Sequence, residues 1–347
     1  MSDRATLSTV AARAGVSPST ASLAFAGSPR VAPATVERVL RAAGELGYAG
    51  PDPIAASLRR GRSGVVGAVI GERLLYAFRD PVAVQMLDGL TEVLGELGVG
   101  LLLLAGDGGP APAQLGRLPL DAAVFATCGL EDDPAFRLLR ARRVPLVAVE
   151  GPVVAGVPLV DIEDRQGTVE LAAHLRELGH RRVAMVTMPL RLDGRRGPVD
   201  ADRLATGVYR DTRERLLGAR EVFADLPAVE TASNGIEEGE QAGAALLSGP
   251  DRPTAILAQS DLLAAGVLRA AAARGLAVPG DLSVAGFDGA DLPWLAPVRL
   301  TTVVQPTAEK GRAAGRAVVA LLAGEVPPDV VFPVVLRPGT TTGPAPA

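Results

Sequence analysis

Near its N-terminus the chain reads Val10-Ala11-Ala12-Arg13-Ala14-Gly15-Val16-Ser17-Pro18-Ser19-Thr20. The apolar residues have helical spacing, and Gly15 can adopt the positive φ of a tight turn. Ala11 is small enough for two helices to cross closely. Ser17 followed by Pro18 is typical of a helix start, because Ser accepts a backbone N–H and Pro lacks the one that would be unsatisfied. The stretch predicts a helix-turn-helix whose second helix can enter the major groove of DNA; an ordinary helical hairpin is the alternative.

Charge is distributed unevenly along the 347 residues, although the net charge is only −4. Residues 1–63 hold eight Arg and four acidic residues, a balance of +4, so the remaining chain carries −8. The chain's one lysine is Lys310. A basic head on an acidic body favours a small DNA-binding module fused to a domain that needs no contact with DNA.

Several classes of protein are disfavoured by what the sequence lacks. The single cysteine, Cys128, permits no internal disulfide, and neither a signal peptide nor an apolar run of membrane-spanning length is apparent, so we expect a cytoplasmic protein without membrane contact. His174 and His180 do not have zinc-site spacing, and His180 is expected to cap a helix that ends at Gly179. No nucleophile elbow, dinucleotide fingerprint or phosphate loop is found. We therefore expect no metal, no cofactor and no enzymatic activity.

The pattern changes along the chain. It is helical to Tyr48 and is broken at Gly50-Pro51-Asp52-Pro53; after a short helical stretch at 54–60 and Gly61-Arg62-Ser63-Gly64, strand-like runs alternate with amphipathic segments. The expected strands are Val65–Ile70, Val99–Leu104, Ala122–Ala126, Pro145–Val149, Arg182–Thr187, Ala255–Ala258 and Leu282–Phe287. The expected helices lie near 82–97, 134–142, 165–178, 213–224, 238–248, 261–274 and 306–323. This alternation predicts parallel sheets in two lobes, with a ligand cleft at the carboxyl ends of the strands.

Motifs over most of the chain resemble the LacI/GalR family of bacterial regulators. They are Val10-Ala11, Ala14-Gly15-Val16-Ser17, Glu45-Leu46-Gly47-Tyr48, Pro53-Ile54-Ala55, Leu178-Gly179-His180-Arg181-Arg182, Ser260-Asp261-Leu262, Gly286-Phe287-Asp288 and Leu300-Thr301-Thr302-Val303 with Gln305-Pro306. The resemblance implies an N-terminal all-α helix-turn-helix head and an α/β two-lobed sensor domain of the type I periplasmic-binding-protein kind. We expect a DNA-binding domain at 1–50, a hinge helix and linker at 51–63, and an effector-binding and dimerisation domain at 64–347. Chain crossovers between the lobes are expected near 161–165, 288–292 and 323–328.

The resemblance also implies which residues contact DNA. Base-reading positions fall on Pro18, Ser19 and Leu23, and an apolar Leu favours contact with a thymine methyl group. Other head residues expected at the DNA are Thr6, Ser17, Thr20 and Ser22.

In the hinge, Leu58 is the implied minor-groove wedge, Ala55 allows two hinge helices to approach closely, and Arg59 contacts phosphate. Leu58 as a linker residue packed on the sensor domain is the alternative, and for Arg59 the alternative is a solvated charge.

By position, the family's effector contacts fall on polar residues near strand ends. They are Asp80, Glu150, Asp164, Arg215, Asn234, Ser260 and Asp288. Carboxylates and a guanidinium suit bidentate hydrogen bonds to vicinal hydroxyls or to a charged effector. Each acid has a surface or helix-capping role as its alternative. The stretch 190–209, which carries four Arg, can form a flap over the pocket or contribute cationic contacts, and the alternative is a tolerated surface insertion.

The sequence therefore predicts a homodimeric transcriptional regulator, more specifically a repressor, of a pseudo-palindromic double-stranded DNA operator. A small-molecule effector, expected to be a sugar or related metabolite, would bind between the lobes and change the affinity for DNA. A regulator tuned by a protein partner, and a solute-binding module without a role at DNA, are the alternatives.

Overall fold

The computed structural model describes residues 5–50, 61–71, 74–106, 115–126, 130 and 132–346. The chain divides into two compact units, Met1–Gly64 and Val65–Ala347, which are described separately below. The predicted hinge contacts Ala55, Leu58 and Arg59 lie outside the described residues.

The first unit contains the predicted helix-turn-helix. Its helices are α1 (Leu7–Ala14), α2 (Pro18–Phe25) and α3 (Pro33–Glu45). Gly15 has a φ of 65°, and the Ser17 hydroxyl accepts the backbone N–H of Thr20 at the start of α2. Ala11 is 1% exposed in a small core that also holds Val10 and Val39. The turn, the cap and the close helix crossing are therefore as the sequence predicts.

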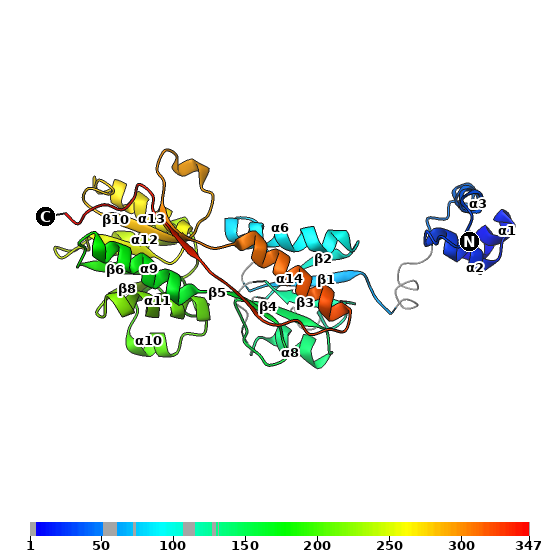
Figure 1. Ribbon diagram of the computed structural model, residues 1–347, viewed down its shortest axis with the longest axis horizontal. Coiled ribbons are helices and arrows are strands. Elements are labelled where there is room, and N and C mark those ends of the chain that lie inside the picture. The colour runs from blue at the N-terminus through cyan, green and yellow to red at the C-terminus, as the bar shows by residue number, and fades with distance from the viewer. Residues whose placement is uncertain are drawn as a thin grey trace. The chain divides into compact units, whose positions relative to one another are not determined.

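The second unit consists of two lobes, each built on one sheet (Figure 1). The strand order in the first sheet is β12-β5-β4-β3-β1-β2. These strands are β1 (Val65–Ile70), β2 (Gly100–Ala105), β3 (Ala122–Phe125), β4 (Leu146–Val149), β5 (Leu159–Ile162) and β12 (Val330–Phe332). The order in the second sheet is β13-β11-β10-β9-β6-β8-β7. These are β6 (Val183–Thr187), β7 (Gly197–Pro198), β8 (Ala228–Glu230), β9 (Ala255–Ala258), β10 (Ser283–Asp288), β11 (Thr301–Val304) and β13 (Val335–Arg337). Pairing is parallel except for β13 and β7 at the two edges of the second sheet.

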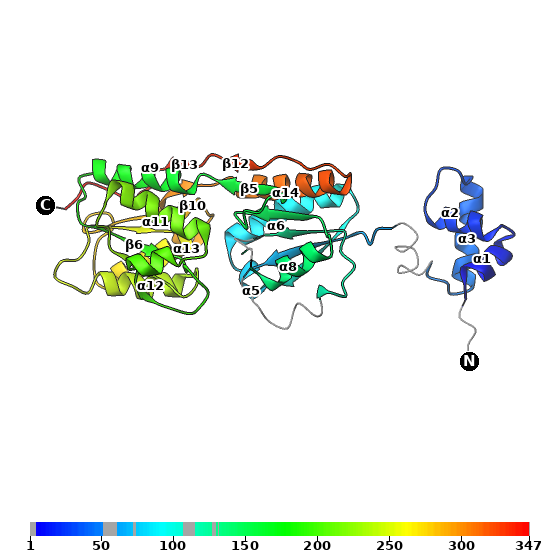
Figure 2. The same ribbon diagram turned by 90° about the horizontal axis from the view of Figure 1, so that it is seen from below.

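Helices cover both faces of each sheet (Figures 1 and 2). The first lobe carries α5 (Leu74–Ala77), α6 (Pro81–Glu96), α8 (Pro134–Ala141) and α14 (Thr307–Leu322). The second carries α9 (Asp164–Glu177), α10 (Ala201–Ala205), α11 (Arg210–Val222), α12 (Ile236–Leu246), α13 (Asp261–Ala272) and the 3₁₀ turn η1 (Pro293–Leu295). Alternate strand residues enter different cores because the side-chain period of a strand is two. Leu257 packs in the core with α9 and α11, whereas its neighbour Ile256 packs in the core with α12 and α13.

The chain crosses between the lobes at three places. The first crossing lies between β5 and α9, at Ile162–Asp164. The second lies between Val304 and Thr307, and the third between Phe332 and Val335. The expected crossings near 288–292 and 323–328 are therefore wrong. Residues 288–292 instead lead into η1 and β11 of the second lobe, and 323–328 lead from α14 into β12 of the first. Neither β11 nor β12 was expected from the sequence pattern, so the chain stays in each lobe for one strand longer.

The helices and strands with a clear hydrophobic pattern lie within a few residues of their predicted bounds. Several short elements without such a pattern were not predicted. No strand was predicted at β5, β7, β8, β11, β12 or β13, which are only two to four residues long. No helix among the described residues has both the length and the apolar character needed to cross a membrane.

Helices α6 and α14 touch backbone to backbone. A Cβ atom on Gly89 of α6 would lie 1.9 Å from the carbonyl oxygen of Ala308, and one on Gly311 of α14 would lie 2.0 Å from that of Met86. Only glycine permits this approach, which fixes α14 against the first lobe.

We therefore expect Gly89→Ala to lower the free energy of unfolding by about 1–3 kcal/mol or more, because the methyl group must push the two backbones apart. Gly95→Ala, in the last turn of the same helix, is the matched control: nothing lies within 4 Å of its Cβ position. That change should be neutral or stabilise the protein by up to about 1 kcal/mol. Urea unfolding of both variants measures the difference, and equal midpoints would contradict the close approach.

Candidate functional site

Apart from Thr6, which directly precedes α1, the proposed DNA-contacting residues of the head lie on or beside α2. Ser17, Pro18, Ser19 and Leu23 are exposed, and Leu23 is a large apolar side chain with 40% of its surface accessible. Thr20 and Ser22 are half-buried. Exposure of an apolar residue beside small hydroxyl side chains leaves this helix face suited to base edges in a DNA groove.

Two of these residues also have a structural role. The Thr6 hydroxyl accepts the backbone N–H of Thr9, whose own hydroxyl accepts the N–H of Thr6, so the pair caps α1. The Ser17 hydroxyl caps α2 by accepting the backbone N–H of Thr20, and it lies 2.8 Å from the Thr20 hydroxyl. Both residues therefore cap a helix while their side chains remain exposed.

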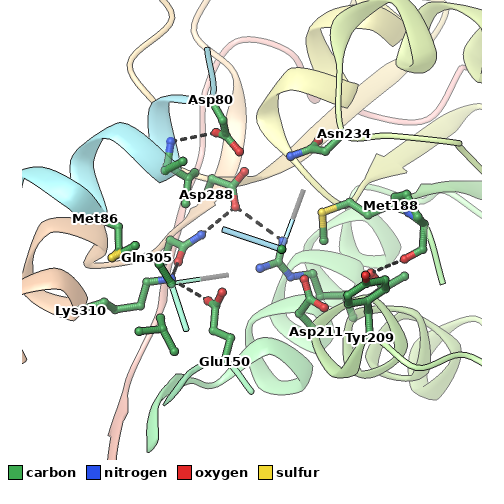
Figure 3. A pocket seen from close by; sticks show the side chains of 18 of the residues that line it. Asp80, Met86, Glu150, Met188, Tyr209, Asp211, Asn234, Asp288, Gln305 and Lys310 are labelled. Carbon is green, nitrogen blue, oxygen red and sulfur yellow. Dashed lines mark hydrogen bonds and ion pairs between the residues drawn. The ribbon is translucent and has the colours of Figure 1, made fainter. Parts of the chain in front are cut away.

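A cavity in the second unit is lined by residues of both lobes (Figure 3). The side chains come from the carboxyl ends of strands and the first turns of helices, where parallel sheets converge. Five of the seven predicted effector residues line it: Asp80, Glu150, Arg215, Asn234 and Asp288. Asp164 and Ser260 do not line it, but each contacts a residue that does.

Arg215 lines the cavity with only 3% of its side chain exposed. Its Nε donates to Asp164 Oδ1 at 2.7 Å, and its Nη1 donates to the backbone oxygen of Gln259 at 2.6 Å and lies 3.5 Å from Asp288 Oδ1. The guanidinium carbon lies 3.7 Å from the centre of the Phe287 ring. Its Nη2 makes no hydrogen bond to any described residue, so two N–H groups remain for a ligand.

Burial dominates the electrostatics around Arg215. Burial raises the pKa of Asp164 to about 7, although the attraction of Arg215 acts in the opposite direction. The pKa of Asp288 is raised well above its ordinary value for the same reason. Burial also disfavours the charge of Arg215, but Asp164 and Asp288 outweigh it and the pKa of Arg215 rises. One guanidinium thus compensates two buried carboxyl groups only in part.

The other predicted residues occupy helix starts. Asp80 is 6% exposed and accepts the N–H of Val82 at 2.9 Å, so it caps α6 while lining the cavity. Ser260 accepts the N–H of Leu263 at the start of α13, and its hydroxyl also bonds to the Asn234 side chain. The capping alternative is correct for Asp80, where it coincides with lining the cavity, and Ser260 also caps a helix although only the acids were assigned this alternative.

Sequence reasoning missed several lining residues, chiefly Lys310, Gln305, Asp211 and Tyr209. A signal for Lys310 was present: it falls on the buried stripe of α14 with Thr307, Gly311 and Ala314, at the three- and four-residue spacing normally filled by apolar side chains.

The stretch 190–209 is tied to the second lobe. Arg203 is 6% exposed and donates two hydrogen bonds to the carboxylate of Glu230 and two to that of Asp193. Arg196 forms an ion pair with Glu238. None of the four Arg of this stretch lines the cavity, whereas Leu192 and Tyr209 do. The stretch therefore contributes an apolar wall, not the cationic contacts considered from the sequence.

His180 is also better anchored than expected. Its backbone N–H donates to the backbone oxygen of Leu175 at 3.1 Å, which is the predicted contact at the helix end. Its ring is fully buried and forms hydrogen bonds with the Thr254 and Ser283 hydroxyls and the backbone oxygen of Gly343. Among the described residues, no three His, Cys, Asp or Glu side chains are grouped so that they could hold a metal ion.

Chemically, the cavity combines carboxylates, two cations and amides with apolar side chains. Val82, Met86, Met188 and Leu192 supply the apolar surface, and Tyr209 is the one aromatic residue among the lining side chains that the structure describes. Alternating donors and acceptors suit a ligand whose groups both donate and accept, and the apolar walls suit its C–H surface.

Comparisons with known proteins agree with both units. Residues 6–50 match the family described as bacterial regulatory proteins, lacI family, and residues 172–342 match the periplasmic binding protein-like domain. The HTH-type transcriptional regulator Rv3575c of Mycobacterium tuberculosis is 37% identical over 356 aligned positions, covering 98% of each chain.

Solved structures give the same result. A LacI-family transcriptional regulator from Corynebacterium glutamicum superposes with a TM-score of 0.73 at 28% identity, covering 96% of this chain and 98% of that one. The complex of the transcriptional regulator CelR with cellobiose gives 0.68 at 29% identity, covering 97% and 100%. With a basic head folded as a helix-turn-helix and a relative 37% identical over nearly its whole length, this chain belongs to the LacI family of DNA-binding transcriptional regulators and is not an enzyme.

Proposed function

We propose that this regulator is a homodimeric repressor of a pseudo-palindromic operator, and that a hydroxyl-rich small molecule bound in the cavity changes its affinity for DNA. The observation that carries the proposal is Arg215: it is buried between two carboxyl groups, yet retains donors at the cavity. A guanidinium held by protein acceptors on one side and open on the other is suited to bind a ligand in a fixed orientation. Because its operator is genomic DNA, the protein would act in the cytoplasm.

The class of effector follows from the lining. A hydroxyl group both donates and accepts, so it can donate to the carboxylates of Asp80, Glu150 and Asp288 and accept from Arg215. CelR, which binds cellobiose in its solved complex, supports a sugar or related polyol. The scarcity of aromatic residues in the cavity favours contacts from Met86, Met188 and Leu192 in place of aromatic stacking. Control by a protein partner remains the second candidate, but the enclosed Arg215 favours a small ligand.

Coupling to DNA would act through the angle between the lobes. The cavity is lined from both lobes, and three chain segments cross between them, so a bound ligand adds contacts that depend on the angle. We propose that the effector moves apart the two hinge segments of the dimer, including residues 51–63, and that this weakens specific DNA binding. A coupling free energy of about 1–3 kcal/mol would be ordinary for such a switch.

The first experiment is footprinting of the DNA upstream of the regulator's own gene, with and without cellobiose, glucose and ribose. We expect a protected palindrome whose protection is weakened by at least one hydroxyl-rich compound. Protection that no small molecule alters, but that a cell extract from which small molecules have been removed does alter, would favour the protein-partner alternative.

The head generates a second prediction. Leu23→Ala should weaken binding to the footprinted operator by about 1–3 kcal/mol, because one base pair in each half-site loses its apolar contact. Leu40→Ala is the matched control, since Leu40 is similarly exposed, at 49%, but lies on α3. Fluorescence anisotropy with specific and scrambled DNA measures both. An equal loss on scrambled DNA would show that Leu23 does not read sequence.

The cavity generates a third. Arg215→Met should remove the response of operator binding to the effector, or shift it to roughly 100-fold higher concentration, because two charge-assisted hydrogen bonds are lost. Asp164 and Asp288 already have raised pKa values and can take up protons in this variant, so the fold should survive. Arg220→Met, on the same helix but outside the cavity lining, is the control. Each variant is compared with its own effector-free affinity, and an undiminished response would place the effector elsewhere.

A further inference from the structure

The one lysine of the chain is buried where the lobes meet. Lys310 lies in the first turn of α14, directly after the second crossing between the lobes, and only 1% of its side chain is exposed. Lysine is rarely buried to this extent unless its charge is paired, because removing an ammonium group from water is unfavourable. Every other cationic side chain in this protein is an arginine, so the compact ammonium group here has a geometry that no other side chain of the chain supplies.

The ammonium group connects polar side chains of the two lobes (Figure 3). Its Nζ donates to Glu150 Oε1 at 2.6 Å, at the end of β4 in the first lobe, and to Gln305 Oε1 in the crossing segment. Gln305 Nε2 in turn donates to Asp288 Oδ1 at 2.8 Å, at the end of β10 in the second lobe, and Asp288 lies beside Arg215. A continuous series of polar contacts therefore runs from the first lobe to the second along the floor of the cavity.

Both carboxylates in this series stand on unusual backbone. Glu150 has a φ of 58° and Asp288 a φ of 120°, values that L side chains rarely adopt. Backbone strain of this kind is retained where surrounding contacts enforce it, and it is concentrated at functional sites. Here it sets the two carboxylates toward Lys310 and Gln305 from opposite lobes.

Lys310 has a donor to spare. An ammonium group has three N–H donors, and Glu150 and Gln305 take two of them. No other described residue accepts the third, and the side chain lines the cavity. An acceptor oxygen on a bound molecule can complete the set.

We propose that Lys310 determines effector specificity by donating this third N–H to a hydroxyl or carboxylate oxygen of the ligand. The inference rests on the proposed function, namely that the cavity binds the effector. The ligand oxygen then joins the contacts between Glu150 and Asp288, so the residue that selects the ligand also connects it to both lobes. A ligand with hydrogen or a methyl group at that point leaves a buried ammonium donor unsatisfied and is rejected.

The single lysine makes a direct test possible. The full-length protein, grown with lysine enriched in ¹³C at Cε, should show one lysine side-chain signal. We expect that signal to shift on titration with whichever of cellobiose, glucose and gluconate alters operator binding, with the same midpoint in both measurements. Gluconate tests whether a carboxylate oxygen of the ligand is the acceptor, and the two sugars test whether a hydroxyl oxygen is.

The outcomes separate this inference from the proposed function. A sugar that alters operator binding while the lysine signal stays in place overturns the role of Lys310 and leaves the proposed function intact. If no hydroxyl-rich compound changes either measurement, both proposals are wrong.

Variants provide a second measurement. In Lys310→Met the concentration for half-maximal response should rise about 10- to 100-fold, the loss expected for one charge-assisted hydrogen bond. Lys310→Arg should recover part of it. Arg316→Met is the matched control, because it removes a cation from the same helix at a side chain that is 55% exposed and pairs with Glu309.

If Lys310→Met folds poorly, the double variant Glu150→Gln with Lys310→Met is measured in place of the single variant. It leaves no carboxylate at position 150 without its cationic partner. A wild-type response in any folded variant that lacks the lysine contradicts the proposal.

Discussion

The guanidinium of Arg215 is the interaction on which the geometry of the cleft depends. It joins Asp164, which follows the first crossing between the lobes, to Asp288 at the end of β10, and it also holds the backbone oxygen of Gln259. Burying these charges carries a penalty of several kcal/mol per ion, which the mutual attraction and the hydrogen bonds offset only while all partners are present. The cluster therefore adds little to the free energy of unfolding, but it tightly constrains the positions of its side chains. Such a positional constraint suits a site whose geometry must differ between its ligand-bound and empty states.

The rest of the second unit brings the lobes to this cluster. Each parallel sheet ends its strands toward the cavity, and helix starts contribute Asp80 and Asn234 from opposite sides. Helix α14 belongs to the first lobe because Gly89 and Gly311 let its backbone touch α6, yet its first turn follows directly from the second lobe. A change in the angle between the lobes must therefore be accommodated in the short crossing segments, which are also the segments that carry Asp164 and Gln305. Ligand contacts and mechanical coupling thus share the same few residues.

Local chemistry explains which predictions from the sequence held. Gly15, Ser17 and Pro18 specify a turn and a helix start through their own backbone and hydroxyl chemistry, and the structure has both. Long amphipathic helices and buried strands were found near their expected bounds because their periodicity is set within one segment. The short strands β11 and β12 were not, since three or four residues have no pattern of their own, and two of the three expected crossings were misplaced as a result. In the cavity, the resemblance led to Arg215 and Asp288 but not to Lys310 or Gln305, whose partners lie on other elements.

By itself, then, the amino-acid sequence determined that a helix-turn-helix precedes a two-lobed α/β domain, that the head is basic and the body acidic, and that the family is one of DNA-binding regulators. The first two properties follow from spacing, composition and local capping chemistry, and the family follows from motifs that resemble it over most of the chain. Only the tertiary structure decided that a lysine on an otherwise apolar stripe meets Glu150, 160 positions earlier, and that Asp164 supports the cavity from behind Arg215 without lining it. The physical reason is that a buried charge is placed by the partners that compensate it, and those partners are brought together by chain crossings and sheet edges that leave no local signal in the sequence.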